Sequence, residues 1–210
     1  MAITAAQVKE LRELTGAGMM DCKKALAETD GNMEAAVDVL RKSGAVKAEK
    51  KASRIAAEGL CMVVTKDDQT AAVVEVNSET DFVAKNATFQ EFVKAVATQA
   101  VNSDAADMDA FMAEKWNEDA SKTVSEALVE KVAVIGENLK IRRFEKVVAE
   151  HGCVVPYVHG GGRIGVIVDA DTDVVNDTVK EAMHNIAMQI AALNPKYVSR
   201  DEVSADYIAH

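Results

Sequence analysis

Apolar residues recur every three or four positions in the first part of the chain, which is the spacing that places side chains on one face of a helix. Val8, Leu11 and Leu14 form the first such face. Thr4 and Gln7 have the spacing of a capping box, in which each side chain accepts a hydrogen bond from the other residue's amide. The pattern therefore predicts a helix that begins near Thr4 and ends at the next Gly-Ala-Gly segment, because glycine adopts the left-handed conformation of a helix stop.

Two more amphipathic helices follow at short spacing. Met19, Cys22 and Leu26 share one face of the second. Asn32 can cap the third, which we expect to end at Gly44. The residues expected to face inward from this third helix are Met33, Ala36, Val37 and Leu40. Three short helices predict a small helical bundle.

The next segment, residues 46–58, is rich in Ala, Lys and Glu but has almost no apolar face. This composition predicts a solvated connecting helix or linker. Its basic side chains could touch RNA, although a solvated charged face is the simpler interpretation. These basic residues are Lys47, Lys50, Lys51 and Arg54.

The pattern then changes from helical to alternating. Two runs of β-branched residues at 60–65 and 70–76, separated by a polar turn, predict a β-hairpin. A helix is expected over 81–101, and its inward residues are Phe89, Phe92, Val93 and Val96. A further helix is expected over 121–135, with Gly136 as its stop, and another over 174–193. Further strands are expected over 138–148, 153–159 and 163–170. Hairpins with helices between them predict an α+β fold with antiparallel sheets rather than a doubly wound parallel sheet.

Composition and charge restrict the class of protein. The chain has 210 residues, 49% apolar and 28% charged, which indicates a globular protein rather than a membrane protein. It shows neither a secretory leader pattern nor a run of ~18 apolar residues, so a cytoplasmic location is the default expectation. The formal net charge of -10 argues against strong binding of nucleic acid. Residues 1–54 hold ten Lys and Arg against eight Asp and Glu, whereas residues 55–210 hold fourteen against twenty-six, which indicates two parts of different electrostatic character.

The chain carries little of the chemistry expected of an enzyme. Cys22, Cys61 and Cys153 are far apart and lack metal-ligand spacing, so we expect reduced thiols and no metal site. Neither G-x-x-x-x-G-K-[ST] nor G-x-G-x-x-G is present, so nucleotide binding by this chain is not expected. His159 and the three glycines after it resemble an oxyanion segment of lipases, but no G-x-S-x-G accompanies them, and a tight turn between two strands is the expected role.

The segment SETDFVAK sets Phe82 where a strand pattern gives way to a helical one. Glu79 and Asp81 could act as an acid and base, but a close pair is expected by chance among 34 acidic residues. From the residues alone two interpretations of Phe82 stay open. It is either a core residue on the first turn of a helix or an exposed aromatic side chain at the tip of a loop.

Four segments carry a resemblance to a known family. They are LRELTGAGMMDCKKAL at 11–26, EVNSETDFVAKN at 75–86, GENLKIRRF at 136–144 and YVHGGGRIGVIV at 157–168. In this order they resemble the signatures of the elongation factor Ts family, the guanine-nucleotide exchange factors of elongation factor Tu. The resemblance extends from residue 2 to about residue 207.

The resemblance implies a UBA-like three-helix domain, a charged linker and a core of two related α+β subdomains, the second incomplete. These parts are expected at residues 1–45, 46–58, 59–150 and 151–210. Longer family members continue with a helical hairpin, further strands and a final helical module. The chain therefore resembles a C-terminally shortened member that ends at His210, and a homodimer is implied only if the hairpin is present.

The resemblance also implies a site. In the family, the Asp-Phe pair that matches Asp81 and Phe82 enters a gap between helices of the partner's GTPase domain near its Mg²⁺ site, and Thr80 and Val83 flank this pair. Residues that match those gripping the GTPase domain are Arg12, Met19, Met20, Lys23 and His159. Met19 could equally be a core residue, because it shares a stripe with the second helix's inward residues.

The function that the resemblance implies is that of an elongation factor with elongation factor Tu as its partner. No cofactor, metal ion, membrane or covalent catalysis is implied for this chain. The first alternative is a UBA-like protein-binding module without exchange activity. A more remote alternative is an esterase that uses the glycine segment after His159.

Overall fold

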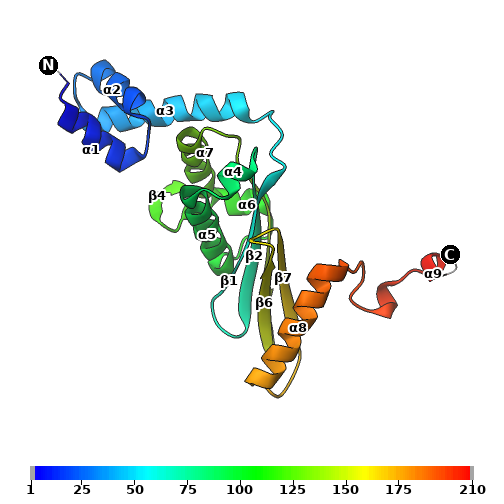
Figure 1. The fold of residues 1–210 in the computed structure, drawn as a ribbon. Coiled ribbons are helices and arrows are strands. Elements are labelled where there is room, and N and C mark those ends of the chain that lie inside the picture. Colours follow the sequence, from blue (N-terminus) through cyan, green and yellow to red (C-terminus); the bar gives the residue numbers. More distant parts are fainter. Residues whose placement is uncertain (1–2, 209–210) are drawn as a thin grey trace.

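The computed structural model describes residues 3–208 of the chain. The helices are α1 Ala5–Thr15, α2 Met19–Glu28, α3 Met33–Lys51, α4 Asp81–Ala84, α5 Ala87–Asn102, α6 Met108–Ala113, α7 Val124–Ile135, α8 Asp177–Leu193, the 3-10 helix η1 Arg200–Glu202 and α9 Ala205–Ile208. The strands are β1 Glu58–Thr65, β2 Thr70–Ser78, β3 Lys115–Trp116, β4 Asp119–Thr123, β5 Lys140–Val148, β6 Cys153–His159 and β7 Ile164–Ala170. Helices and antiparallel strand pairs occur together, which confirms the predicted α+β class (Figure 1).

The first three helices pack into a small bundle at one end of the molecule (Figure 1). The capping box of α1 is present, because the amide of Gln7 donates to Thr4 Oγ1 over 3.2 Å and the amide of Thr4 donates to Gln7 Oε1 over 3.0 Å. The bundle closes around its own apolar core, whose buried members are Val8, Leu11, Cys22, Ala25, Leu26 and Ala36. This part of the chain therefore folds as the apolar pattern predicts.

Two apolar positions of the predicted stripes lie outside this core: Leu14, which the pattern placed inward, and Met19, for which the core was one of two interpretations. Leu14 and Met19 are both exposed. Leu14 lies in the last turn of α1 and Met19 is the first residue of α2, so both stand beside the glycine turn that joins these helices. The apolar stripe is wrong at these two positions because the neighbouring helices of the bundle do not cover the helix ends.

The helix α3 does not end at Gly44, as the sequence suggested, but continues to Lys51. Gly44 is buried and has no positive φ, so it is not a helix stop. A glycine inside a helix costs about 0.5–1 kcal/mol relative to alanine. Space explains its presence, because a Cβ on Gly44 would lie 3.2 Å from Cβ of Ala133 in α7. The boundary expected at residue 45 thus falls within one continuous helix.

A three-stranded antiparallel sheet with the order β1-β2-β5 lies at the centre of the fold. The predicted hairpin is confirmed, with Thr65 opposite Ala71 at its closed end. Helix α5 packs on one face of this sheet and α7 packs against α5. The large side chains of this core include Val74, Val76, Phe89, Phe92, Val93, Val96 and Trp116. All four residues expected to face inward from the helix at 81–101 are buried.

That helix is divided in two. A short helix, α4, ends at Ala84, and α5 begins at Ala87. Asn86 separates them, because its Oδ1 accepts hydrogen bonds from the amides of Thr88 and Phe89 over 2.9 and 3.4 Å and so caps α5. The break sets the direction of α4 independently of α5.

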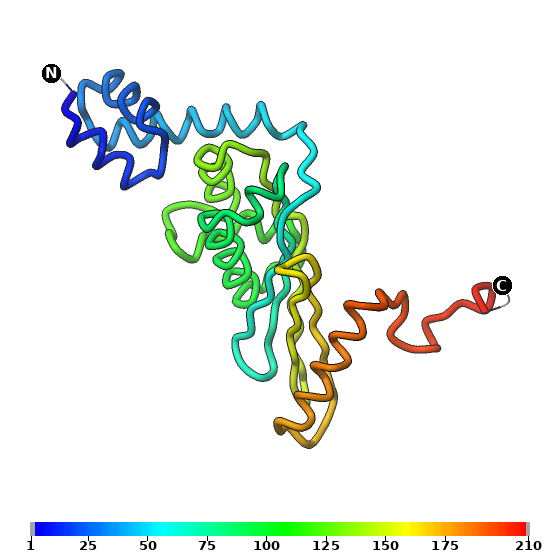
Figure 2. The backbone as a smooth tube through the Cα atoms, in the orientation of Figure 1, coloured from blue at the N-terminus to red at the C-terminus, as the bar shows by residue number. Residues whose placement is uncertain are grey.

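The β6–β7 hairpin packs on the opposite face of the central sheet, and α8 covers the outer side of this hairpin (Figure 2). Alternation along β6 produces both contacts: Val154 packs toward the sheet, whereas Cys153 and Val155 pack against Met183 of α8. The molecule is therefore layered as helices, sheet, hairpin and helix.

Beyond α8 the chain continues through η1 and α9. His210, where the expected second subdomain ends, lies outside the described residues. The division of the chain at residues 45, 58 and 150 stays a prediction. Within residues 3–208, no helix has the length and apolar character needed to cross a membrane.

Gly165 of β7 is a point of close approach between the hairpin and the sheet. A Cβ there would lie 2.9 Å from Val73 Cγ2 and 3.2 Å from Cys61 Cβ. We expect Gly165→Val to lower the free energy of unfolding in urea by about 1–3 kcal/mol, because the added methyl groups force the layers apart. Gly165→Ala should cost less in a Val73→Ala background than in the wild-type chain. Equal costs in the two backgrounds would show that this contact does not set the spacing.

Candidate functional site

Phe82 projects from α4, the four-residue helix between β2 and α5. Its side chain is 80% exposed, whereas the rings of Phe89, Phe92 and Phe111 are fully buried. The two residues after Phe82 point the other way: Val83 packs against the main core and Ala84 is buried. The short helix thus holds its second residue out in solvent while its end is anchored in the core. Of the two interpretations left open by the sequence, the core residue is wrong.

The carboxylate of Glu137 fastens the start of this helix. Its Oε2 accepts hydrogen bonds from the amides of Glu79 and Thr80 over 3.0 and 3.1 Å, and its Oε1 accepts one from the hydroxyl of Thr80 over 2.6 Å. Glu137 follows the Gly136 stop of α7 and is far from Thr80 in sequence. Hydrogen bonds to an ionised acceptor are about twice as strong as neutral ones. Residues 79–80 are therefore held by a group from another part of the chain.

In a second set of contacts between the same two segments, Glu79 is the acceptor and the loop after α7 supplies the donor. The amide of Asn138 donates to Glu79 Oε1 over 2.6 Å. The guanidinium of Arg54 lies 3.5 Å from the same carboxylate oxygen, and the side chain of Asn138 donates to the carbonyl of Arg54 over 2.7 Å. We call these five residues, Arg54, Glu79, Thr80, Glu137 and Asn138, the tip clamp. It joins the segment after α3, the end of β2 and the loop after α7.

Asp81 lies beside Phe82 at the start of α4 and is paired with Lys85. Lys85 Nζ donates to Asp81 Oδ2 over 2.7 Å. This hydrogen bond and the positive charge of Lys85 hold the pKa of Asp81 below its ordinary value, so the carboxylate is ionised at neutral pH. Because the pair is exposed, it contributes little to stability. It does place a negative charge next to the exposed ring.

His159 ends β6 at the same end of the central sheet. Its turn touches the start of β1, because the amide of Cys61 donates to the carbonyl of Gly162 over 2.6 Å. The start of β1 in turn pairs with Ser78, directly before the tip clamp. The glycines after His159 adopt positive φ between β6 and β7, which confirms the predicted turn. Tyr157 OH lies 2.8 Å from His159 Nδ1 and orients this exposed ring.

The remaining predicted residues lie on the bundle. Met20 is 73% exposed and Met19 is 59% exposed, and Arg12 and Lys23 are exposed as well. They lie on α1 and α2, around the glycine turn. Figure 1 shows that this turn and α4 belong to separate parts of the molecule. The structure therefore arranges the predicted residues as two surfaces, one at the sheet end and one on the bundle.

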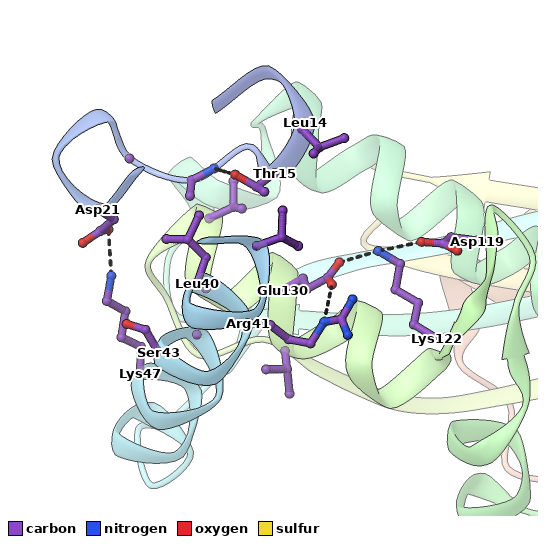
Figure 3. A pocket seen from close by; sticks show the side chains of 17 residues that line it. Leu14, Thr15, Asp21, Leu40, Arg41, Ser43, Lys47, Asp119, Lys122 and Glu130 are labelled. Atoms are coloured by element: carbon purple, nitrogen blue, oxygen red, sulfur yellow. Dashed lines mark hydrogen bonds and ion pairs between the residues drawn. The ribbon is translucent and has the colours of Figure 1, made fainter. Parts of the chain in front are cut away.

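A cavity of about 250 Å³ lies between the bundle and α7 (Figure 3). Its apolar lining includes Leu14, Val37, Leu40, Val129, Ala133 and Val134. Ion pairs border it, with Lys47 Nζ 2.8 Å from Asp21 Oδ2 and Arg41 Nε 4.0 Å from Glu130 Oε1. The sequence pattern did not indicate this cavity.

The described residues contain no arrangement of three or more His, Cys, Asp or Glu side chains that could hold a metal ion. Cys22, Cys61 and Cys153 are free. Burial raises the pKa of the Cys61 thiol, with a further contribution from the charge of Glu75. This thiol is therefore protonated at neutral pH.

Comparison with known proteins identifies the family. A family model described as Elongation factor TS matches residues 79–210. Elongation factor Ts of Clostridioides difficile is 57% identical over 209 residues, which cover 99% of this chain and 68% of the relative. The chain belongs to the elongation factor Ts family. Relatives of the same name from Trichlorobacter lovleyi and Halothermothrix orenii are 51% and 48% identical, each over 99% of this chain and over 68% and 69% of their own lengths.

Three members of the tip clamp were missed by sequence reasoning: Arg54, Glu137 and Asn138. Glu137 belongs to a segment that carries the family resemblance, but its spacing from Thr80 gives no sign of contact. Arg54 was assigned to a solvated charged face. In the structure it is partly exposed and also paired with Glu79.

Glu137→Ala should release the amides of Glu79 and Thr80. Loss of this acceptor leaves donors unpaired at a cost of about 1–3 kcal/mol, so we expect amide exchange at these two positions to accelerate by about tenfold or more. Hydrogen exchange followed by NMR measures this directly. Glu137→Gln keeps one acceptor oxygen and should show a smaller effect, and Glu150→Ala, at an exposed loop position, should show none. Unchanged protection in Glu137→Ala would contradict the clamp.

Proposed function

We propose that the chain accelerates GDP release from elongation factor Tu by inserting the tip formed by Asp81 and Phe82 beside the partner's Mg²⁺ site. Membership of the elongation factor Ts family supports nucleotide exchange on elongation factor Tu as the general activity. The single observation that supports the tip is the 80% exposure of Phe82 on a clamped four-residue helix. An aromatic ring left in water is available to bury its surface in a partner.

The physical basis is mechanical. A phenylalanine side chain can bury about 150–250 Å². Packed helices prefer discrete arrangements to gradual deformation, so a ring that enters between two of them favours a different arrangement of the nucleotide pocket. The P-loop amides and Mg²⁺ provide much of the hold on the GDP phosphates, and displacing them speeds release.

The tip must be stiff to act in this way. A flexible loop would bend away from the partner's helices, whereas the tip clamp holds the start of α4 through hydrogen bonds from Glu79 and Thr80 to Glu137. The packing of Val83 and Ala84 holds its end. The negative charge of Asp81 beside Phe82 favours displacement of groups that coordinate a cation.

Coupling between the factor and the nucleotide is reciprocal. A protein that weakens GDP binding is itself bound more weakly when nucleotide is present, and the two affinities fall by the same ratio. Incoming GTP therefore releases the factor from elongation factor Tu. No covalent step in this chain is required, and no cofactor, metal ion or nucleotide bound by the chain itself enters the cycle.

Arg12, Met19, Met20, Lys23 and His159 form the second part of the proposal, as residues that hold the GTPase domain. Their exposure supports this role. The methionines suit a contact surface because the thioether side chain adapts to irregular shapes. Elongation factor Tu acts in translation, so the proposed location is the cytoplasm.

Phe82→Ala should leave the fold intact and slow the release of fluorescent GDP from elongation factor Tu by about tenfold, as the loss of about 1–3 kcal/mol of anchor contact would. The rate is followed against the concentration of the chain. Val198→Ala removes an exposed apolar side chain elsewhere and should not change the rate.

Wild-type release with Phe82→Ala, at unchanged circular dichroism, would reject the tip mechanism. Binding to elongation factor Tu without any acceleration by the wild-type chain would instead favour a UBA-like binding module.

Arg12→Ala combined with Met20→Ala should weaken the complex with elongation factor Tu by about tenfold, because an interface anchor contributes more than ~1 kcal/mol. Isothermal titration calorimetry gives the affinity. The matched control is Lys9→Ala with Ala27→Ser, two exposed positions on the same helices. An unchanged affinity for the first variant would remove Arg12 and Met20 from the interface.

A further inference from the structure

The bundle meets the rest of the molecule where α3 crosses α7 (Figure 1). Gly44 lies at this crossing, with its ideal Cβ position 3.2 Å from Ala133 Cβ. Gly16 approaches the same helix, with its ideal Cβ position 3.4 Å from Val134 Cγ2. Two glycines of the bundle therefore allow close approach to two consecutive residues of α7.

Polar contacts between α3 and α7 contribute less than this close packing. Arg41 Nε lies 4.0 Å from Glu130 Oε1, and both side chains are partly solvated. Such pairs contribute little and are screened by salt. On one side of the crossing lies the cavity of about 250 Å³, so side chains do not fill the junction completely (Figure 3). Gly44 therefore permits the close approach of α3 to Ala133 of α7, and Ala48 of α3 also packs against the main core. The side chains at such contacts determine how closely two helices approach.

Helix α3 connects this crossing to both proposed contact surfaces, the one around Met20 and the one at the Phe82 tip. It has 19 residues, which corresponds to a length of about 28 Å. Its beginning is part of the bundle core through Ala36, while three residues beyond its end Arg54 enters the tip clamp. The helix thus connects the surface around Met20 to the base of the Phe82 tip and is supported between them at Gly44.

We infer that Gly44 is a positioning residue for nucleotide exchange, which rests on the proposed function: its contact with Ala133 places the bundle so that both surfaces reach one GTPase at the same time. Two contact surfaces joined in a fixed geometry bind with a gain in effective concentration, and this gain is lost when the geometry prevents simultaneous contact. A larger residue at position 44 moves the bundle, whereas the hydrogen bonds of Glu137 and Asn138 to residues 79–80 keep the Phe82 tip in place.

The test is Gly44→Leu in the full chain. Leucine favours the helix more than glycine does, so a loss of activity cannot come from melting of α3. We expect the concentration of chain that gives half-maximal GDP release to rise about tenfold, while the rate at saturation stays within about twofold of wild type, because only the gain from joined surfaces is lost. A variant with an impaired tip lowers the saturating rate instead.

Two further variants distinguish a change in the placement of the bundle from a general loss of stability. Ala45→Leu enlarges the exposed neighbour on the same helix and should behave as wild type. Gly44→Ala should give a smaller rise in the half-maximal concentration, and adding Ala133→Gly should reverse it, because the methyl group then changes sides within the same contact. Failure of this reversal, or an equal loss in Ala45→Leu, overturns the inference.

A distance measurement distinguishes this inference from the proposed function. Spin labels at Glu28→Cys in the bundle and Glu91→Cys in α5, both exposed positions, report the placement of the bundle by pulsed electron resonance in a Cys61→Ser background. The separation should shift in Gly44→Leu and stay unchanged in Ala45→Leu.

An unchanged separation in Gly44→Leu overturns the inference whatever the exchange assay gives. If the separation shifts but the half-maximal concentration does not, the role in exchange is overturned. If the wild-type chain does not accelerate GDP release, the proposed function fails and the inferred role in exchange fails with it.

Discussion

The hydrogen bonds between Glu137 and residues 79–80 are the constraint on which the candidate site depends. Glu79 and Thr80 follow the last residue of β2, where two backbone amides and a hydroxyl need acceptors. The carboxylate after α7 supplies all of them. With these groups satisfied, a helix of only four residues has a fixed start, although a helix of this length is not stable alone. The position of Phe82 depends on that fixed start.

This arrangement explains how an apolar ring can be exposed in a well-packed protein. Single exposed apolar residues are normal on protein surfaces, and their exposure alone is no sign of function. Phe82 differs because the backbone on both sides of it is held, by the clamp before it and by Val83 and Ala84 after it. The chain fixes the place of the ring without burying it, which is the property that the proposed insertion requires.

Three glycines of this chain have different structural roles: one ends a helix, one permits contact between two helices and one permits contact between a strand and the central sheet. Gly136 ends α7 in the left-handed conformation, as predicted. Gly44 lies inside α3 and permits contact with α7, and Gly165 lies inside β7 and permits contact with the central sheet. In sequence, Gly44 and Gly136 each follow an amphipathic helical stretch, so the same rule predicted a helix stop at both. It was wrong at Gly44 because the reason for that glycine lies in another helix.

The sequence by itself determined the α+β class, the caps at Thr4 and Asn32, the hairpins and the turn after His159. These features depend on side chains within a few residues of one another, whose chemistry the linear pattern contains. Only the tertiary structure decided that Phe82 is exposed, that Leu14 and Met19 leave the bundle core, and that Glu137 holds Thr80. Each of these outcomes depends on which surfaces meet after packing, and hydrophobic periodicity specifies an apolar face without specifying what covers it.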